Sequence, residues 1–433
     1  MNASLYTADY KDAPFWWDDA PRPVFEDTAS LPASADVLVI GSGYTGLAAA
    51  LECARGGRST VVVDAEDAGW GCSSRNGGQV STSIKPSLDR LTARHGRDIA
   101  FEIRYEGIRA LDYIEDFIKR EGLKVNWERA GRFHGAHNAR RYEVLAQSLG
   151  EVPKELKTDA YMVPRAEQHG EIASDRYFGG MVMPHHATLH PAKYVNALIS
   201  LVRQAGATIV PRCRVEGLNR EAGGFAVVTS AGSVKAREVI VATNGYTGPV
   251  TPWQRRRVIP IGSYIIATEA LDPSVAHGLS PHARAMSDTR RLVFYYRLSP
   301  DRKRMLFGGR VAYMENDPRV SAPRLHARMC EIYPQLKSTR VSHSWVGFVA
   351  YTFDTLPHIG RHDGLYYAMG YCGSGVSLAT YFGMRVGQKL LGRPEGRTPF
   401  DNCTFRTRPL YGGYPWFLAP SIMWYRLLDR LPI

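Results

Sequence analysis

The chain contains 433 residues, of which 44% are hydrophobic and 22% are charged. These are ordinary values for a globular protein, and the length favours two domains over one small core. The formal net charge is +12, which is compatible with an anionic ligand, a lipid surface or a nucleic acid as partner. The arginine clusters lie mid-chain without a nucleic-acid-binding motif, so we expect a basic solvated surface and no nucleic acid.

Cysteine usage and the N-terminus bear on location. The six cysteines are scattered without a C-x-x-C pair or a metal-ligand spacing, so we expect reduced thiols and no metal site. Residues 1–11 lack the basic and apolar regions of a signal peptide, and no apolar run approaches the roughly 18 residues of a membrane span. The expected location is cytoplasmic.

The chain begins with an expected arm, residues 1–32. Its prolines disfavour regular structure, but the run Phe15-Trp16-Trp17 requires burial, so we expect the arm to lie ordered across the body. Hydrophobic periodicity then predicts helices and strands. The expected elements are, in chain order, a strand at 36–40, a helix at 47–56, a strand at 59–63, two surface helices within 88–121, a strand at 234–242, antiparallel strands at 262–268 and 292–297, and a helix at 375–391.

This order predicts an α/β (α+β) fold in which a Rossmann-like dinucleotide-binding domain is interleaved with a substrate domain built on an antiparallel sheet. The C-terminal tail is rich in tryptophan, tyrosine and arginine, so it either packs as a final helix or touches a membrane surface peripherally. The expected boundaries are a discontinuous dinucleotide-binding domain at 33–90, 150–250 and 340–400, a substrate domain at 91–149 and 251–339, and a tail at 401–433.

A G-x-G-x-x-G motif follows the first predicted strand. Gly41 permits a tight turn, Gly43 lets the backbone approach a pyrophosphate, and Gly46 allows close packing of helix on strand. The helix that begins near Tyr44 directs its free N–H groups at the phosphates. Asp64 ends the second strand, where a carboxylate binds ribose hydroxyls and repels the 2′-phosphate of NADP. The motif therefore predicts NAD or FAD.

Two further glycine-rich segments favour the larger cofactor. Residues 68–79 carry hydroxyls, small side chains and Arg75, which could neutralise pyrophosphate charge. Residues 369–376 precede a second helix, whose N-terminus suits the partial negative charge of a reduced flavin. Together, these segments predict FAD.

The chain resembles the FAD-dependent oxidoreductases of the D-amino-acid oxidase superfamily, and within it the γ-glutamylputrescine oxidoreductase branch. The N-terminal aromatic arm also fits that branch. The motifs that carry the resemblance are VIGSGYTGL (39–47), GWGCSSRNGGQ (69–79), FYYR (294–297), LFGG (306–309), YPQL (333–336), SWVG (344–347), LPHIG (356–360) and GYCGSGV (370–376).

The resemblance implies a set of FAD contacts. It also implies non-covalent FAD, because Phe348, Val349 and Ala350 stand where some relatives carry a flavin-linking cysteine. No clear counterpart of the oxygen-activating lysine was found, which leaves oxidase and dehydrogenase both open. The implied FAD-contacting residues are Gly41, Ser42, Gly43, Tyr44, Thr45, Gly46, Asp64, Ala65, Gly71, Ser73, Ser74, Arg75, Asn76, Gly77, Gly78, Gln79, Val215, Thr243, Asn244, Gly245, Gly373, Ser374, Gly375 and Val376.

The implied reaction is oxidation of an amine or amino acid by hydride transfer to flavin N5, giving an imine that hydrolyses. The substrate is expected to be γ-glutamylputrescine-like, an N-substituted amine that bears a carboxylate. Arg297 could grip that carboxylate, with Tyr295, Tyr264 and Tyr351 as aromatic wall. The electron acceptor would be O2 or a quinone or other electron carrier.

Three alternatives stay open at this point. The substrate could be sarcosine-like or a D-amino acid. The chain could be a flavin-dependent tRNA-modifying or RNA-binding component, which predicts salt-sensitive tRNA binding. It could also be a non-catalytic subunit that binds FAD structurally, whose flavin no amine would reduce.

Overall fold

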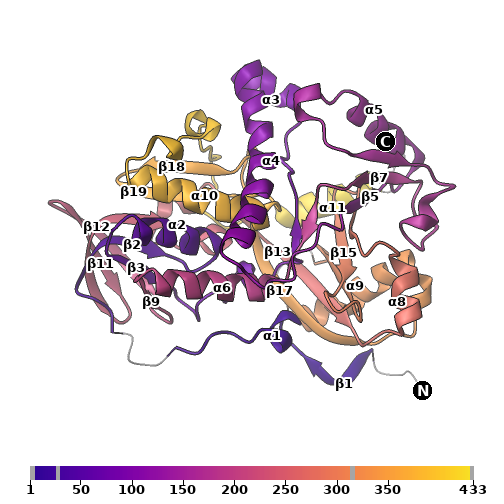
Figure 1. Ribbon diagram of the computed structural model, residues 1–433, viewed down its shortest axis with the longest axis horizontal. Helices are drawn as coiled ribbons and strands as arrows, with labels where there is room; N and C mark the ends of the chain where they lie inside the picture. The colour runs from indigo at the N-terminus through magenta and orange to yellow at the C-terminus, as the bar shows by residue number, and fades with distance from the viewer. Residues whose placement is uncertain (1–4, 26–29, 313–316, 430–433) are drawn as a thin grey trace.

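The computed structural model describes residues 5–25, 30–312 and 317–429. Parts of the predicted arm (1–4 and 26–29), of the substrate domain (313–316) and of the tail (430–433) lie outside these residues. Within the described residues the long strands form an eight-stranded and a nine-stranded sheet, which lie beside each other in Figure 1. None of the described helices is long and apolar enough to cross a membrane.

The first sheet is built on the predicted strand–turn–helix–strand unit. Strand β2 (Ser34–Ile40) and strand β3 (Thr60–Val63) pair in parallel, and helix α2 (Tyr44–Arg55) connects them. Both strands are runs of buried β-branched and apolar residues, as expected for a sheet covered on both faces. The remaining strands of this sheet are β9 (Thr208–Val210), β10 (Val215–Glu221), β11 (Gly224–Thr229), β12 (Gly232–Val241), β18 (His358–His362) and β19 (Leu365–Met369).

The second sheet is mainly antiparallel, as predicted, with β1–β17 and β14–β5 as its parallel pairs. Its order is β1-β17-β13-β16-β15-β14-β5-β7-β6. The strands span Tyr6–Lys11 (β1), Arg132–Gly135 (β5), Tyr161–Val163 (β6), Gly180–Met183 (β7), Ile259–Thr268 (β13), Ala285–Asp288 (β14), Phe294–Leu298 (β15), Met305–Gly309 (β16) and Val341–Tyr351 (β17).

Strand pairing corrects the predicted boundaries. Strand β17 lies in the second sheet, although residues 340–400 were assigned to the dinucleotide-binding domain, because it pairs with β13 along its length. Strands β6 and β7 join the same sheet, although they fall within 150–250. In contrast, helices α3 (Leu88–His95) and α4 (Arg97–Arg120) pack in the core that covers the first sheet. Local sequence does not show which sheet an element joins.

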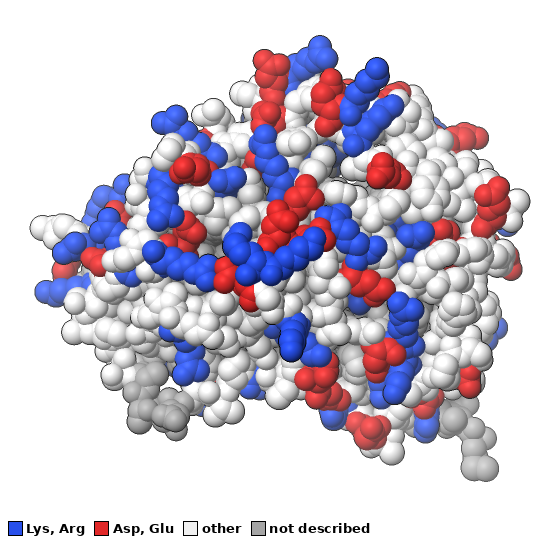
Figure 2. Space-filling view, viewed as in Figure 1, with Lys and Arg blue, Asp and Glu red and all other residues white. Residues whose placement is uncertain are grey.

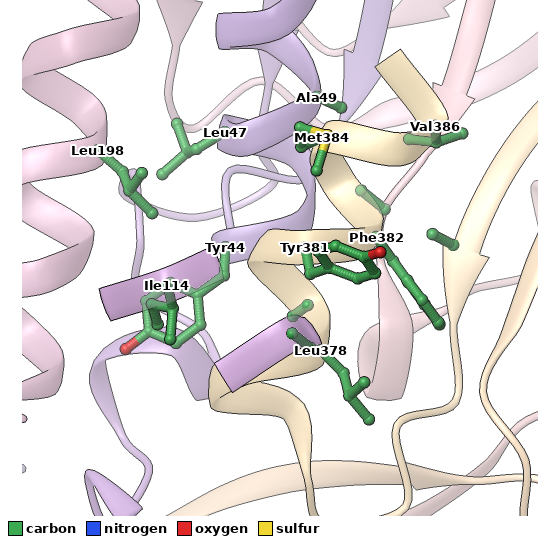
Figure 3. Packing of buried hydrophobic residues seen from close by; sticks show 14 of the residues in the cluster. Tyr44, Leu47, Ala49, Ile114, Leu198, Leu378, Tyr381, Phe382, Met384 and Val386 are labelled. Atoms are coloured by element: carbon green, nitrogen blue, oxygen red, sulfur yellow. The ribbon is translucent and has the colours of Figure 1, made fainter. Parts of the chain in front are cut away.

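Helices α2, α4 and α10 (Gly375–Leu390) meet in that core, which Figure 3 shows around Tyr44, Ile114 and Phe382. Helix α4 was expected at the surface, but its apolar stripe, which includes Ile114, is fully buried. Gly383 allows α10 to approach α2 closely, since a Cβ there would lie 2.3 Å from the carbonyl oxygen of Thr45. This contact holds the first turn of α2 against the middle of α10.

The other elements surround the two sheets. The described part of the arm is more regular than its prolines suggested: β1 pairs with β17, and the side chain of Trp16 is fully buried. The remaining elements are α1 (Trp16–Asp19), β4 (Gln79–Val80), α5 (Ala139–Gly150), β8 (Ala187–Thr188), α6 (Pro191–Gln204), α7 (Pro252–Arg255), α8 (Pro273–Leu279), α9 (Pro318–Ile332) and α11 (Leu418–Leu428).

Basic residues do not form a single field on the face shown in Figure 2, where lysines and arginines alternate with acidic side chains. On α4, for example, Arg109 is paired with Glu102 at 2.9 Å and with Glu106 at 2.8 Å. This face therefore has the mixed charge of an ordinary solvated surface.

Candidate FAD site

A cavity of about 790 Å³ lies where the glycine turn after β2, the start of α10 and the end of β17 meet. Fifteen of the residues predicted to contact the cofactor line it. They are Gly41, Gly43, Tyr44, Thr45, Asp64, Ala65, Gly71, Ser73, Asn76, Val215, Thr243, Asn244, Gly373, Gly375 and Val376.

The glycine turn has the geometry that its sequence predicts. Gly41 adopts a φ of 104°, in the region that favours glycine, and its N–H donates to the carbonyl oxygen of Val63 at 2.8 Å. A Cβ on Gly46 would lie 1.8 Å from the carbonyl oxygen of Gly41, so a larger residue would force α2 away from β2. Gly46 therefore lies beneath the turn and not on the cavity wall.

Asp64 lies at the cavity wall and is held by Ser42. Its Oδ2 accepts hydrogen bonds from the backbone N–H (2.7 Å) and the hydroxyl (2.5 Å) of Ser42, and its Oδ1 accepts from the N–H of Glu66 at 3.0 Å. Burial raises the pKa of Asp64, and the hydrogen bonds from Ser42 oppose that shift. The fixed carboxylate still has acceptor capacity for ribose hydroxyls.

The second glycine-rich segment contributes Ser73 and Asn76 to the wall. Ser73 Oγ accepts the backbone N–H of Tyr44 at 2.9 Å, at the first turn of α2. The amide of Asn76 donates to the carbonyl oxygens of Cys72 and Ser73 at 3.0 Å and fixes the segment's curvature. These polar groups lie at a helix N-terminus, where a pyrophosphate is stabilised.

Arg75 does not line the cavity, which corrects its predicted role in neutralising the pyrophosphate. Its guanidinium lies between two indoles, 4.1 Å from the ring centroid of Trp70 and 4.8 Å from that of Trp17. It donates to the carbonyl oxygens of Trp70 at 2.8 Å and Val346 at 3.3 Å. Arg75 thus links the segment to the arm and to β17.

Other residues of this segment also turn away from the cavity. Gln79 bonds to the second sheet: its Oε1 accepts from Arg132 at 2.7 Å, and its Nε2 donates to Tyr296 O at 3.2 Å. The predicted contacts that do not line the cavity are Ser42, Gly46, Ser74, Arg75, Gly77, Gly78, Gln79, Gly245 and Ser374. They shape the backbone of the site, because sequence proximity to a motif does not fix the direction of each side chain.

The third segment bends sharply before α10. Cys372 and Gly373 have positive φ values of 52° and 95°, and the N–H of Gly370 donates to Asn244 Oδ1 at 2.9 Å. The hydroxyl of Tyr371 lies 2.6 Å from that of Thr45, on the first turn of α2. The two helix starts are therefore joined directly at the cavity.

An aromatic wall was missed by sequence reasoning. Trp70, Tyr246 and Phe348 line the cavity, and Tyr246 makes edge contacts with both of the other rings. The N–H of Phe348 also donates to the Tyr246 hydroxyl at 3.3 Å. Trp70 lies in one of the family motifs and Phe348 at the expected flavin-linking position, but no spacing in the sequence indicated that these rings and Tyr246, from three distant segments, would meet. The other missed lining residues include Cys72, Cys213, Arg214, Val349, Ala350 and Tyr371.

Arg297 is not available to a substrate, which corrects the predicted carboxylate grip. The residue is only 4% exposed, and its guanidinium donates to the carbonyl oxygens of Gly78 (3.1 Å) and Leu189 (3.0 Å). Burial lowers its pKa to about 10. Arg297 therefore supports the backbone turn at Gly78.

The three tyrosines that were predicted to form an aromatic wall lie in different places in the structure. Tyr264 lies in the second core, because alternation along β13 directs Ser263 and not Tyr264 toward Tyr295. The ring of Tyr295 lies 3.0 Å from the position of a Cβ on Gly77. The hydroxyl of Tyr351 lies 3.8 Å from the position of a Cβ on Gly373. Tyr295 and Tyr351 thus lie beside segments that are predicted to contact the flavin, whereas the prediction that Tyr264 forms part of this wall is wrong.

The cavity extends from Asp64 and Val215 to Gly373 and Val376, and glycines allow close approach of the backbone at both ends. A helix N-terminus, a ribose-binding carboxylate and an aromatic wall fit an elongated dinucleotide. All six cysteines are free thiols, and the described residues contain no group of three or more potential metal ligands. These features define a dinucleotide-dependent oxidoreductase with a two-sheet fold.

Comparison with known proteins identifies the family. The model of the FAD dependent oxidoreductase family (DAO) matches residues 36–389, so the chain belongs to this family and binds FAD. It is 30% identical to γ-glutamylputrescine oxidoreductase of Escherichia coli (strain K12) over 94% of this chain and 96% of the relative. It is 31% identical to the probable oxidoreductase OrdL of Rhizobium meliloti (strain 1021), over 94% and 95% of the two chains.

Solved structures share the fold at low identity. Glycine oxidase from Geobacillus kaustophilus superposes with a TM-score of 0.72 at 18% identity, covering 87% of this chain and 99% of the other. L-proline dehydrogenase from P. horikoshii gives 0.69 at 17% identity, covering 90% and 99%. The predicted FAD-binding oxidoreductase fold is confirmed.

Proposed function

We propose that this enzyme oxidises a small amine or amino acid that bears a carboxylate, with an N-substituted, γ-glutamylputrescine-like molecule as the first substrate to test. The names of its relatives support an amine or amino acid as substrate. The observations behind the carboxylate are that Lys85 lies near Tyr351, that Arg132 bonds to Gln79, and that the charges of both cations act on His134.

The charges of both cations act on His134. Burial and the charges of Arg132 and Lys85 lower the pKa of this histidine to about 3, so its ring is neutral at physiological pH. Lys85 is exposed, and its Nζ lies 6.0 Å from the ring centroid of Tyr351. The guanidinium of Arg132 donates to Gln79 Oε1 at 2.7 Å. Among the described residues, neither cation forms an ion pair; Lys85 is exposed, whereas Arg132 is partly buried and burial lowers its pKa to about 10.

Bound FAD supplies the acceptor for the hydride of the substrate's α-carbon, and the resulting imine then hydrolyses. The chain's own residues orient the substrate and exclude water. The cation pair would fix the carboxylate, and Tyr351 would cover the apolar part, so that the C–H bond points toward the flavin end. The Nδ1 of His134 lies 2.8 Å from the Ser287 hydroxyl, which holds the imidazole ring in place.

The test is an anaerobic screen in which loss of the oxidised flavin absorbance is followed with paired amines, each with and without the carboxylate. We expect the carboxylate member of a pair to bind about 10- to 100-fold more tightly. Arg132→Met and Lys85→Met should remove that preference with little change in the limiting rate of reduction. Arg109→Met, which removes a cation from the outer face of α4, should leave it intact.

The same screen separates the alternatives. If a sarcosine-like amine or a D-amino acid reduced the flavin fastest, that compound would replace the γ-glutamylputrescine-like molecule as the proposed substrate. Equal binding of both members of every pair would overturn the proposal that the substrate bears a carboxylate. A flavin that no amine reduces would indicate a non-catalytic subunit. Reoxidation of the reduced enzyme by O2 or by a soluble quinone identifies the acceptor, and release of the flavin on acid precipitation tests non-covalent binding.

A further inference from the structure

The C-terminal part of the described chain exposes large apolar side chains. We refer to residues 410–428, which include helix α11, as the C-terminal surface. Grouped exposure of this kind marks an interaction site, whereas single exposed apolar residues are normal. Its exposed large apolar and aromatic side chains, between 42% and 91% accessible, are Leu410, Tyr414, Trp416, Met423, Trp424, Tyr425 and Leu427.

This surface is anchored to the body. The Tyr411 hydroxyl donates to the carbonyl oxygen of Val258 at 2.6 Å, and Ile422 is buried. The rings of Tyr411 and Phe417 pack on Phe353, with centroids 5.2 Å and 6.3 Å away. Just beyond α11, Asp429 Oδ1 accepts the N–H of Arg291 at 2.9 Å. The exposed side chains are therefore presented by a fixed element.

The C-terminal surface and the seven residues before it carry charge of one sign, and the flanking Asp401 and Asp429 are bonded to Lys389 and to the backbone of Arg291 and Leu292. Every charged residue between 403 and 428 is an arginine, namely Arg406, Arg408 and Arg426. Arg406 and Arg408 are exposed, and the guanidinium of Arg408 lies 6.0 Å from the ring centroid of Phe353. Tryptophan and tyrosine beside arginine are the residues that favour the boundary between lipid headgroups and acyl chains.

We propose that the C-terminal surface docks on an anionic lipid bilayer, with Trp416, Met423, Trp424 and Leu427 inserted at the headgroup boundary and Arg406 and Arg408 on lipid phosphates. The surface adjoins Phe353, two residues from Tyr351 at the flavin end of the site, so docking brings that end close to the bilayer. The proposal does not depend on the substrate, because docking is measured without one.

A second copy of this chain fits the surface less well. A symmetric dimer brings the same patch of both subunits together, so Arg406 and Arg408 would face their own copies. Since residues 403–428 contain no acidic residue, nothing in that stretch would neutralise the arginines. An anionic headgroup layer supplies the missing negative charge.

The test is co-sedimentation of the FAD-loaded full-length protein with vesicles of phosphatidylglycerol and phosphatidylcholine, or of phosphatidylcholine alone. We expect partitioning onto the anionic vesicles that weakens as salt is added. The triple variant M423S/W424S/L427S should reduce it about tenfold or more. R406Q/R408Q should reduce it about fivefold for each charge removed.

The matched control V144S/V275S/V320S removes three exposed apolar side chains elsewhere and should bind as the unchanged protein does. Retained flavin absorbance and circular dichroism establish that each variant is folded. Absence of vesicle binding by the unchanged protein would overturn the proposal, as would equal binding by the triple variant. A dimer in sedimentation velocity that the triple variant abolishes, without vesicle binding, would assign the surface to a second copy instead.

Discussion

The hydroxyl groups of Thr45 and Tyr371 lie 2.6 Å apart, although 326 residues separate them in the chain. Thr45 is on the first turn of α2, Tyr371 precedes α10, and both line the FAD cavity. This buried hydrogen bond joins the two helix N-termini, so it stabilises the cavity wall only when both segments are in place.

Removing either hydroxyl should weaken FAD binding. Tyr371→Phe and Thr45→Val each delete one partner of a buried hydrogen bond worth about 1 kcal/mol, which corresponds to about a fivefold rise in the Kd for FAD. Fluorescence titration of the apoprotein with FAD measures this Kd. Tyr381→Phe, whose hydroxyl accepts from Arg385 outside the cavity, is the control and should leave the Kd unchanged. An unaltered Kd in both test variants would contradict the role of this bond.

The arm should stabilise the FAD-binding segment through Trp16. Its indole Nε1 donates to the carbonyl oxygen of Asn76 at 2.8 Å. Trp16→Phe leaves that oxygen without its donor and should cost about 1–3 kcal/mol of unfolding free energy. Thermal unfolding of the FAD-loaded protein should detect the loss. Trp127→Phe provides the comparison and should cost less, because the buried indole nitrogen of Trp127 has no hydrogen-bond partner among the described residues. Equal losses would show that the hydrogen bond is unimportant.

Close packing of α10 on α2 should not tolerate a methyl group at Gly383. Gly383→Ala places a Cβ 2.3 Å from the Thr45 carbonyl oxygen, so the helices must separate, at a cost of about 1–3 kcal/mol. Gly150→Ala on α5 meets nothing within 4 Å and should be neutral or stabilise by about 0.4–1 kcal/mol. Urea unfolding of both variants measures the difference. Similar stabilities would refute the tight helix contact.

Glu115 should contribute to acid sensitivity. Burial raises its pKa, but hydrogen bonds from Arg129 and Lys119 outweigh burial and lower the pKa from 4.5 to about 2. A carboxyl with a depressed pKa stabilises the folded state above its unfolded value and loses that contribution as pH falls. Glu115→Gln should therefore destabilise the protein at pH 7 and flatten the fall in unfolding free energy between about pH 4.5 and pH 2. An unchanged slope would contradict the shift.

The sequence sufficed where structure depends on neighbours along the chain. Gly41, Gly46 and Asp64 belong to one short strand–turn–helix–strand unit, in which the turn's φ and the packing of Gly46 depend on adjacent residues alone. The helix after Gly375 is similarly local. These features, with the family motifs, were enough to predict FAD and 15 of the 34 residues that line the cavity.

Arg75 and Arg297 show where that reasoning stops. Period-two alternation places Tyr295 and Arg297 on one face of β15, but it does not show that Gly78 and Leu189 supply carbonyl oxygens opposite that face. Arg75 lies in a cofactor motif, yet Trp17 of the arm and Trp70 hold its guanidinium away from the cavity.

By itself, the sequence determined the cofactor and the two helix starts of its candidate site, because glycine turns and helix N-termini are local structures. Only the tertiary structure decided that Trp70, Tyr246 and Phe348 form one wall, and that the charges of Lys85 and Arg132 both act on His134. The pairing of β17 with β13 sets the position of Phe348 and Tyr351, and such long-range register depends on how whole sheets and helices pack.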